Sequence, residues 1–249
     1  MEFETKVQFL TQPEHNRRTI VISDIHGHRA WLEKLLKKVN FSEKDILIIV
    51  GDMIEKGPES LNTIRYIMEL CEKYTVYPMM GNVDLWRIQM LLTEDGSLDQ
   101  ELYETNERMR QSWKATFFQD LCLEAGVSAK TPEEIPAARE AVVVHFQREL
   151  TFMKELPTIL VTPAFTFVHG GLVHEKLEDN FHLPPFRLLK NDNFINQGKH
   201  FDKYVVVGHW PVCLYRSDIE SSAPYISEEQ KIIAIDGGCG IKRDDQLNA

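Results

Sequence analysis

Short runs of β-branched and aliphatic residues recur in the first eighty residues, and each run stops abruptly at polar residues or glycine. The runs occupy residues 19–22, 46–50 and 75–80, and Pro78 argues against a full ladder in the third. Between the runs, apolar residues return every three or four positions, as they do on the buried face of a helix. This alternation predicts a parallel or mixed sheet whose strands are joined by right-handed helical crossovers.

The strand pattern returns in the last third of the chain. The later runs occupy 164–168, 204–207 and 232–235, and a looser alternation at 2–10 predicts an edge strand. Each of the three later runs ends in histidine or aspartate beside glycine. Because open α/β sheets place their ligands at the carboxyl ends of the strands, we expect these polar residues to gather at one edge.

Residues 85–157 lack the strand pattern and predict helices instead. The expected helices span 85–92, 98–118 and 135–156. We therefore predict a single α/β domain over residues 1–249, with a helical insertion at about 85–157. Four aromatic residues of the insertion are expected to form a packing core rather than a base-stacking surface: Trp86, Trp113, Phe117 and Phe118.

Composition and charge exclude several classes of partner. The chain has 249 residues, of which 43% are hydrophobic and 27% charged, and its formal net charge is −10. This balance argues against a nucleic-acid footprint and against binding to anionic membranes. The longest aliphatic run, 46–50, is too short to span a bilayer, and the start of the chain is polar and acidic, unlike a signal peptide. Four scattered cysteines form no Cys-x-x-Cys pair, so we expect reduced thiols in a cytoplasmic protein.

The polar residues at the strand ends form a set of potential metal ligands. The set consists of Asp24, His26, Asp52, Asn82, His169 and His209. Carboxylate, amide and imidazole donors together suit Mn²⁺, Fe or Zn²⁺ better than Ca²⁺. Six ligands are too many for one ion, but two ions bridged by one carboxylate would use them all. Such a pair activates a bridging water and supports an in-line displacement at phosphorus.

The order of these motifs resembles that of the calcineurin-like metallophosphoesterase superfamily, whose pattern is Asp-x-His, Gly-Asp, Gly-Asn, His and Gly-His. The forms His169-Gly-Gly, Gly208-His209 and Ile235-Asp236-Gly-Gly-Cys place the resemblance near the bacterial phosphoprotein phosphatase and symmetrical dinucleoside tetraphosphatase branch. The resemblance covers most of the chain outside the insertion. It implies a fold of two packed mixed β-sheets flanked by helices.

The resemblance also implies roles for the ligands. Asp24 and His26 would bind one metal ion, and Asp52 would bridge both ions. The second ion would be bound by the remaining three ligands: Asn82, His169 and His209. Two transition-metal ions are expected, with Mn²⁺ first and Fe or Zn²⁺ as alternatives.

The chain departs from the branch at two positions. Members of the branch have a Gly-Asn-His-Glu or Gly-Asn-His-Asp motif whose histidine is the leaving-group acid, but in this chain the position is Val83. Members also have a Gly-Asp-x-x-Asp-Arg-Gly motif, in which the aspartate is the acid's carboxylate partner and the arginine grips the phosphate. Here these two positions are Glu55 and Lys56, and the lysine loses the bidentate geometry of arginine. The sequence Gly-Asn-Val-Asp is more similar to the Gly-Asn-Cys-Asp of small bacterial phosphodiesterases.

Three residues are candidates for the missing acid or phosphate clamp: His28, His174 and Arg87. His28 is the best placed, two residues past a ligand. For His174 and Arg87 a solvated surface role is the alternative. We also expect the insertion near Trp86 and Arg87 to border the substrate pocket and to help select the substrate.

The expected function is that of a two-metal phosphoric ester hydrolase of the serine/threonine-phosphatase type, acting through Asp52 and its neighbours. A dinucleoside polyphosphate hydrolase or a phosphodiesterase is the alternative within the enzyme class. A weakened phosphate-binding regulatory protein is the alternative outside it. The expected partner is a phosphorylated small molecule, a nucleotide or a phosphoprotein.

Overall fold

Two β-sheets pack against each other in the computed structural model, which describes residues 3–10, 17–93, 95–112, 116–216, 221–241 and 247–248. The smaller sheet is wholly parallel, with the order β2-β3-β4, and the larger sheet is mixed, with the order β1-β5-β6-β7-β9-β8. The strands are β1 (Val7–Phe9), β2 (Thr19–Ile22), β3 (Ile46–Ile49), β4 (Thr75–Pro78), β5 (Ile159–Val161), β6 (Phe165–Val168), β7 (Tyr204–Val207), β8 (Tyr225–Ser227) and β9 (Ile232–Ala234). The predicted two-sheet α/β fold is confirmed, although only the larger sheet is mixed.

Alternation along β3 explains why its four residues are all buried. Ile46 and Ile48 face the larger sheet, where they join a cluster with Phe167 and Val206. Leu47 and Ile49 face the other way and belong to the cluster that includes the crossover helices α1 (Arg29–Lys38) and α2 (Ser60–Lys73). Since successive side chains of a strand point to opposite faces, a strand covered on both sides must be apolar throughout.

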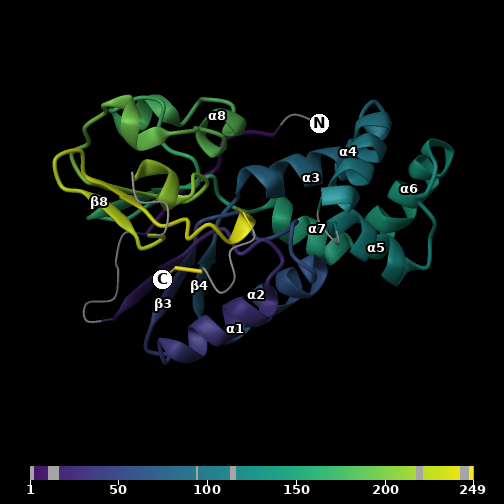
Figure 1. The fold of residues 1–249 in the computed structure, drawn as a ribbon, viewed down its shortest axis with the longest axis horizontal. Helices are drawn as coiled ribbons and strands as arrows, with labels where there is room; N and C mark the ends of the chain where they lie inside the picture. The colour runs from purple at the N-terminus through teal and green to yellow at the C-terminus, as the bar shows by residue number, and fades with distance from the viewer. Residues whose placement is uncertain are drawn as a thin grey trace.

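The region predicted as a helical insertion is indeed helical, and Figure 1 shows its helices together at one end of the molecule. The elements here are α3 (Asn82–Leu92), α4 (Asp99–Ser112), α5 (Phe117–Ala125), η1 (Pro132–Glu134), α6 (Ile135–His145) and α7 (Gln147–Lys154). The later short helices are η2 (Leu177–Asn180), α8 (Pro185–Leu189), η3 (Phe194–Gln197), η4 (Val212–Tyr215) and η5 (Cys239–Ile241).

Two of the expected long helices are wrong, because each is interrupted. The helix expected over 98–118 ends at Ser112, and α5 begins after Thr116, whose hydroxyl caps the backbone N–H of Gln119. The helix expected over 135–156 breaks at Phe146, a fully buried residue that separates α6 from α7 in the chain.

The aromatic packing core is confirmed in part. Phe117 and Phe118 are fully buried, whereas Trp86 is partly exposed. Trp113 lies outside the described residues. The four cysteines are free thiols, as expected. The three-residue strands β5 and β8 were not predicted.

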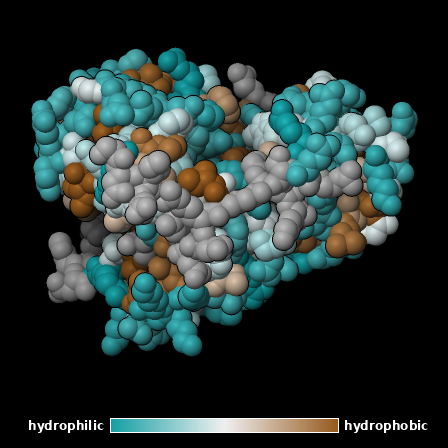
Figure 2. Space-filling view, in the orientation of Figure 1, coloured by the Kyte–Doolittle hydropathy of each residue, from teal (hydrophilic) through white to brown (hydrophobic). Residues whose placement is uncertain are grey.

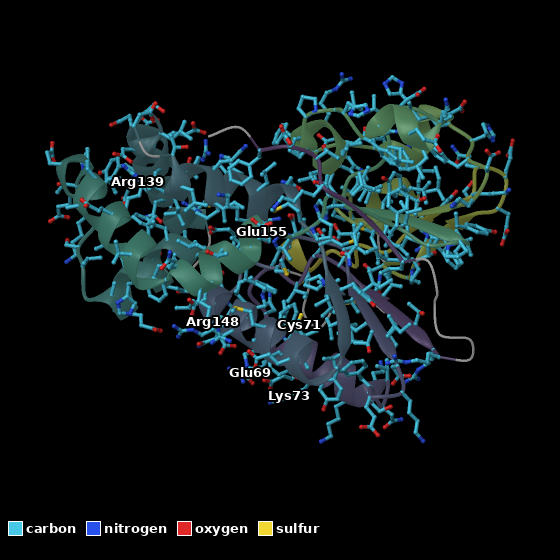
Figure 3. All side chains as sticks on the ribbon, turned by 180° about the vertical axis from the view of Figure 1, so that it is seen from behind. Glu69, Cys71, Lys73, Arg139, Arg148 and Glu155 are labelled. Carbon is cyan, nitrogen blue, oxygen red and sulfur yellow. The ribbon has the colours of Figure 1, made fainter. Side chains whose placement is uncertain are left out.

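One hydrophobic cluster joins the insertion to the rest of the fold. It runs from Ile22 and Leu32 through Ile64 to Phe118 and Phe146. Ion pairs reinforce this contact at the surface. Arg65 of α2 pairs with Glu149 of α7 at 2.8 Å, and Arg148 of α7, labelled in Figure 3, pairs with Glu72 of α2 at 2.7 Å.

Hydrophobic residues at the surface are dispersed. Figure 2 shows a largely hydrophilic face with hydrophobic residues in small separate groups. The large exposed side chains come from many elements, among them Phe9, Leu123, Phe186 and Ile226. In the part of the chain that the structure describes, no helix is both long and apolar enough to cross a membrane.

Because the insertion shares its core with the sheet and α2, we predict a single unfolding transition for the whole chain. Phe118→Ala should lower the free energy of unfolding by about 3–5 kcal/mol without splitting that transition. Leu123→Ala on the same helix is the matched control, since Leu123 is 83% exposed and should have little effect. Unfolding of both variants in urea is followed by circular dichroism and by tryptophan fluorescence. If the two signals changed at different urea concentrations, the insertion would be a separate folding unit.

Candidate metal centre

The carboxyl ends of strands from both sheets meet at one edge. Asp24 and His26 follow β2, Asp52 follows β3, and Asn82 opens α3 just after β4. The larger sheet contributes His169 after β6, His209 after β7 and Asp236 after β9.

Glycines allow the loops to approach each other closely here. A Cβ on Gly81 would lie 2.1 Å from the backbone nitrogen of Asp52, so any side chain at position 81 would displace a ligand. Gly51 has φ +77°, and a Cβ there would lie 2.6 Å from the Cα of Gly81. The glycines beside the ligands are therefore required by the geometry of the centre.

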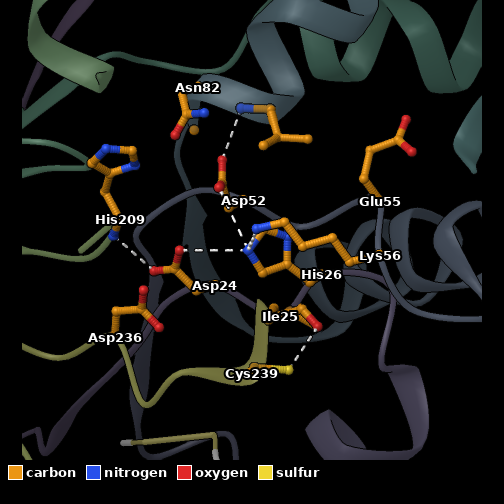
Figure 4. A network of polar contacts seen from close by, with 12 residues as sticks. Asp24, Ile25, His26, Asp52, Glu55, Lys56, Asn82, His209, Asp236 and Cys239 are labelled. Atoms are coloured by element: carbon orange, nitrogen blue, oxygen red, sulfur yellow. Dashed lines mark hydrogen bonds and ion pairs between the residues drawn. The ribbon is translucent and has the colours of Figure 1, made fainter. Parts of the chain in front are cut away.

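Two groups of potential ligands share Asp52. Asp24, His26 and Asp52 form the first group, and Asp52, His169 and His209 form the second. Within each group the ligand atoms all lie within 4.8 Å of one another. All five residues except His209 are buried. Figure 4 shows Asp52 in the middle of this arrangement.

Contacts within the first group centre on the His26 imidazole. Its Nε2 lies 3.8 Å from Asp24 Oδ1 and 3.6 Å from Asp52 Oδ2. Its Nδ1 lies 3.2 Å from the carbonyl oxygen of Ile54, which fixes the ring. A ring held through one nitrogen presents the other to a cation.

Contacts within the second group centre on His169. Its Nε2 lies 3.3 Å from Asp52 Oδ1 and 3.0 Å from Asn82 Oδ1, and its Nδ1 lies 2.8 Å from the carbonyl oxygen of Val50. The His169 and His209 rings are 5.3 Å apart between centroids. The backbone N–H of His209 donates to Asp24 Oδ2 at 3.0 Å, which connects the two groups.

The electrostatics of the centre favour a bound positive charge. Burial raises the pKa of Asp24 to about 6, opposed by His169 and reinforced by Asp52. Burial works against the charged form of His169 too, but Asp52 and Asp24 raise its pKa to about 10. The same imidazole holds the pKa of Asp52 well below its usual range, against the effect of burial.

The residues present fit a pair of transition-metal ions. Asp24 Oδ1 is buried and has no hydrogen-bond partner among the described residues, which is costly unless a cation approaches it. The donors are carboxylate and amide oxygens and imidazole nitrogens, the set that suits Mn²⁺, Fe or Zn²⁺. Asp24 and His26 would hold one ion, Asn82, His169 and His209 the other, and Asp52 both.

Lys56, predicted as the phosphate-gripping cation, lies at the centre. Its Nζ is 2.9 Å from His26 Nε2, and together with burial its charge lowers the pKa of His26 to about 3. His28, predicted as the acid, is held by contacts with Ile25, Cys239 and Trp31. Its Nδ1 lies 3.1 Å from the Ile25 carbonyl oxygen and 3.3 Å from Cys239 Sγ, and its ring stacks on Trp31 at 4.1 Å.

The predicted role of Arg87 as a phosphate clamp needs correction, and so does its surface alternative. Its side chain is 0% exposed, and its Nε donates to Glu55 Oε1 at 2.7 Å. A fully buried guanidinium cannot contact a substrate phosphate in this arrangement. His174 is exposed in a loop that Asn180 organises, and no contact joins it to the described ligands.

Two acidic residues of the centre were not predicted. Asp192 Oδ1 lies 2.6 Å from His209 Nε2 and also pairs with Lys190, yet its loop follows no strand and gives no sequence signal. Asp84 accepts the backbone N–H groups of Met53 at 3.0 Å and Gly81 at 2.9 Å, so it ties two ligand loops together. Asp84 follows the end of β4, and this position in the sequence could have identified it as part of the centre.

Comparison with known proteins identifies one family. Residues 17–223 match the model of calcineurin-like phosphoesterases. A symmetrical bis(5'-nucleosyl)-tetraphosphatase of Vibrio parahaemolyticus is 41% identical over 68 residues, which are 27% of this chain and 25% of that protein. The match to such curated relatives thus spans only about a quarter of their length.

Two solved structures share the fold. One, provisionally named a diadenosine tetraphosphatase, is 20% identical with a TM-score of 0.57, covering 95% of this chain and 90% of that chain. The other is a cold-active protein-tyrosine phosphatase of a psychrophilic Shewanella, 13% identical with a TM-score of 0.56, covering 99% of this chain and 77% of that chain. At these identities the likeness concerns the fold alone.

The shared position of Asp52 leads to a prediction about metal content. We expect about two transition-metal ions per chain in protein reconstituted with Mn²⁺. Asp24→Asn should weaken binding of one ion, whereas Asp52→Asn should weaken both, because its carboxylate serves both groups. His174→Ala is the matched control and should keep both ions. Elemental analysis after dialysis measures the content, and equal ion content in Asp52→Asn and wild type would contradict the shared role.

Proposed function

This chain belongs to the calcineurin-like phosphoesterase family, and we propose that it is a metal-dependent hydrolase of phosphoric esters or anhydrides that uses two transition-metal ions. The observation that carries the proposal is the buried Asp52 shared by two ligand groups. When bound, two such ions supply an activated water and positive charge opposite the transferring phosphoryl group. The protein contributes the fixed geometry and a charged partner for the substrate.

Lys56 is that charged partner in our proposal. Its ammonium lies beside His26 Nε2 and so brings positive charge to the place where phosphoryl oxygens would dock. A lysine binds such oxygens as a point charge, without the paired donors of an arginine. Lys56 therefore stabilises charge on the phosphoryl group but orients it less strictly.

Val83 influences which substrates can react. Its side chain is buried, and its backbone N–H donates to Asp52 Oδ1 at 2.9 Å. The position thus supports the shared ligand but offers no proton to a leaving group. General acid catalysis is typically worth about 10²–10⁴-fold, and it matters most when the leaving group is a poor one.

A dinucleoside polyphosphate or another phosphoanhydride is accordingly the substrate class we favour, since a departing nucleotide needs little protonation. The partial likeness to symmetrical bis(5'-nucleosyl)-tetraphosphatases supports the same choice. An activity of the serine/threonine-phosphatase type, which must expel an alkoxide, is the second candidate. It requires another acid, for which His28 is the available imidazole.

Leaving-group dependence tests the proposal. In the Mn²⁺-loaded protein, kcat/KM should fall steeply as the leaving-group pKa rises across substituted phenyl and alkyl phosphates, and diadenosine tetraphosphate should exceed a phosphoserine peptide. Val83→His should improve alkyl phosphates by about tenfold or more while changing aryl phosphates little. Glu55 Oε2, which has no partner among the described residues, is the acceptor available to orient the new ring.

Val83→Asn is the control, because it is polar but has no proton to transfer near neutral pH. If kcat/KM of the wild type did not change with leaving-group pKa while chemistry was rate-limiting, another group would supply the proton. An activity of the serine/threonine-phosphatase type would then replace our proposal. A protein that binds metal and phosphate but hydrolyses nothing in the panel would instead be a binding or regulatory protein.

A further inference from the structure

A buried ion pair joins the helical insertion to the loop that carries Lys56. Arg87 of α3 donates from Nε to Glu55 Oε1 at 2.7 Å, and both side chains are fully buried. Arg87 Nη2 also contacts Met109 Sδ of α4 at 3.6 Å. Within the described part of the chain, Glu55 Oε2 and Arg87 Nη1 have no hydrogen-bond partner. Such an under-satisfied pair is a poor way to stabilise a fold, which suggests that its position serves the site.

The backbone at Glu55 and Lys56 is unusual. Both residues are left-handed, with φ of +67° and +68°, a conformation that costs free energy for residues with a Cβ. The backbone N–H of Glu55 donates to Ser60 Oγ at 2.9 Å, and that of Gly57 donates to the Glu55 carbonyl oxygen at 2.8 Å. A turn of this kind persists only when its surroundings hold it in place.

The two side chains of this turn leave in different directions. Figure 4 shows the Glu55 carboxylate pointing away from the centre, whereas the Lys56 side chain extends into it. At its tip, Lys56 Nζ lies 2.9 Å from His26 Nε2, and a Cβ on Gly240 would lie 2.7 Å from Nζ. The ammonium therefore occupies a narrow place between a ligand and the C-terminal turn. Any rotation of the turn at Glu55 would withdraw it.

We propose that Arg87 is a positioning residue, which acts through Glu55 to hold Lys56 where it contacts the phosphoryl group of the substrate. The inference rests on the proposed function for the identity of that ligand. It makes the insertion a contributor to phosphate binding, although the guanidinium itself never reaches the substrate. Arg87 thereby sets the strength of phosphate binding from within the core.

A double-mutant cycle tests this proposal. The variants are Arg87→Met, Lys56→Met and the double variant, with Arg87→Lys as a milder change that keeps the buried positive charge. Arg139→Met is the matched control: Arg139, labelled in Figure 3, pairs with Asp99 at 2.6 Å within the insertion, with side chains 13% and 15% exposed. The readouts on Mn²⁺-loaded protein are the Kd of inorganic phosphate by calorimetry, kcat/KM, metal content and thermal unfolding.

We expect Lys56→Met and Arg87→Met each to weaken phosphate binding by about tenfold, with metal content unchanged. In the Lys56→Met background, Arg87→Met should add less than about twofold, because the residue it positions is gone. Arg87→Lys should give a smaller effect that also disappears in that background. Arg139→Met should change stability only.

Equal losses from Arg87→Met in both backgrounds would overturn the proposal, since Arg87 would then act independently of Lys56. Unchanged phosphate binding in Arg87→Met or Arg87→Lys would overturn it as well. Should Arg87→Met not fold, Arg87→Lys carries the cycle alone. Absence of turnover in the wild type would count against the proposed function only, because the phosphate Kd still reports whether Arg87 and Lys56 are coupled.

Discussion

Four carboxylates are buried together at the edge where the two sheets meet, and the rest of the centre is arranged around them. Asp24, Asp52, Asp84 and Asp236 are each at most 3% exposed. Burial and mutual repulsion raise the pKa of Asp24, Asp84 and Asp236, while His169 keeps that of Asp52 low. Such a concentration of acidic groups calls for cations. Binding of metal ions at this edge would therefore couple metal affinity to folding stability, because the same charges would determine both.

The ligands can lie so close because the loops continue the pairing of the strands beyond their ends. The backbone N–H of Asp24 donates to the Gly51 carbonyl oxygen at 3.0 Å, and that of His26 donates to the Asp52 carbonyl oxygen at 2.9 Å. These three non-glycine residues have left-handed backbones, which Asp and His tolerate better than most residues. The recurrence of aspartate, histidine and glycine at these strand ends thus has a conformational cause as well as a chemical one.

Local patterns in the sequence were enough to predict the sheet edge. Apolar runs define the long strands, and the polar residue after each run can be identified without knowledge of the rest of the fold. The ion pair between Glu55 and Arg87 could not be found this way, because 32 positions separate partners that only the packing of the insertion brings together. Asp192 was missed for a similar reason, since it reaches His209 from a loop whose sequence resembles any polar turn. Helix breaks such as Phe146 depend on packing, not on spacing.

The valine at position 83 and the ion pair between Glu55 and Arg87 are physically connected. Positions 83 and 87 lie one turn apart on the same face of α3, and helical side chains lean toward the N-terminus of their helix. With valine at position 83, the carboxylate that would orient an imidazole instead accepts a hydrogen bond from Arg87. A guanidinium stays protonated, so it can neutralise Glu55 but cannot transfer a proton. The partner of the Glu55 carboxylate in this chain therefore supplies fixed charge and no proton. If Lys56 binds the phosphoryl group as we propose, its positioning through Glu55 and Arg87 is separate from protonation of the leaving group, for which position 83 supplies no acid.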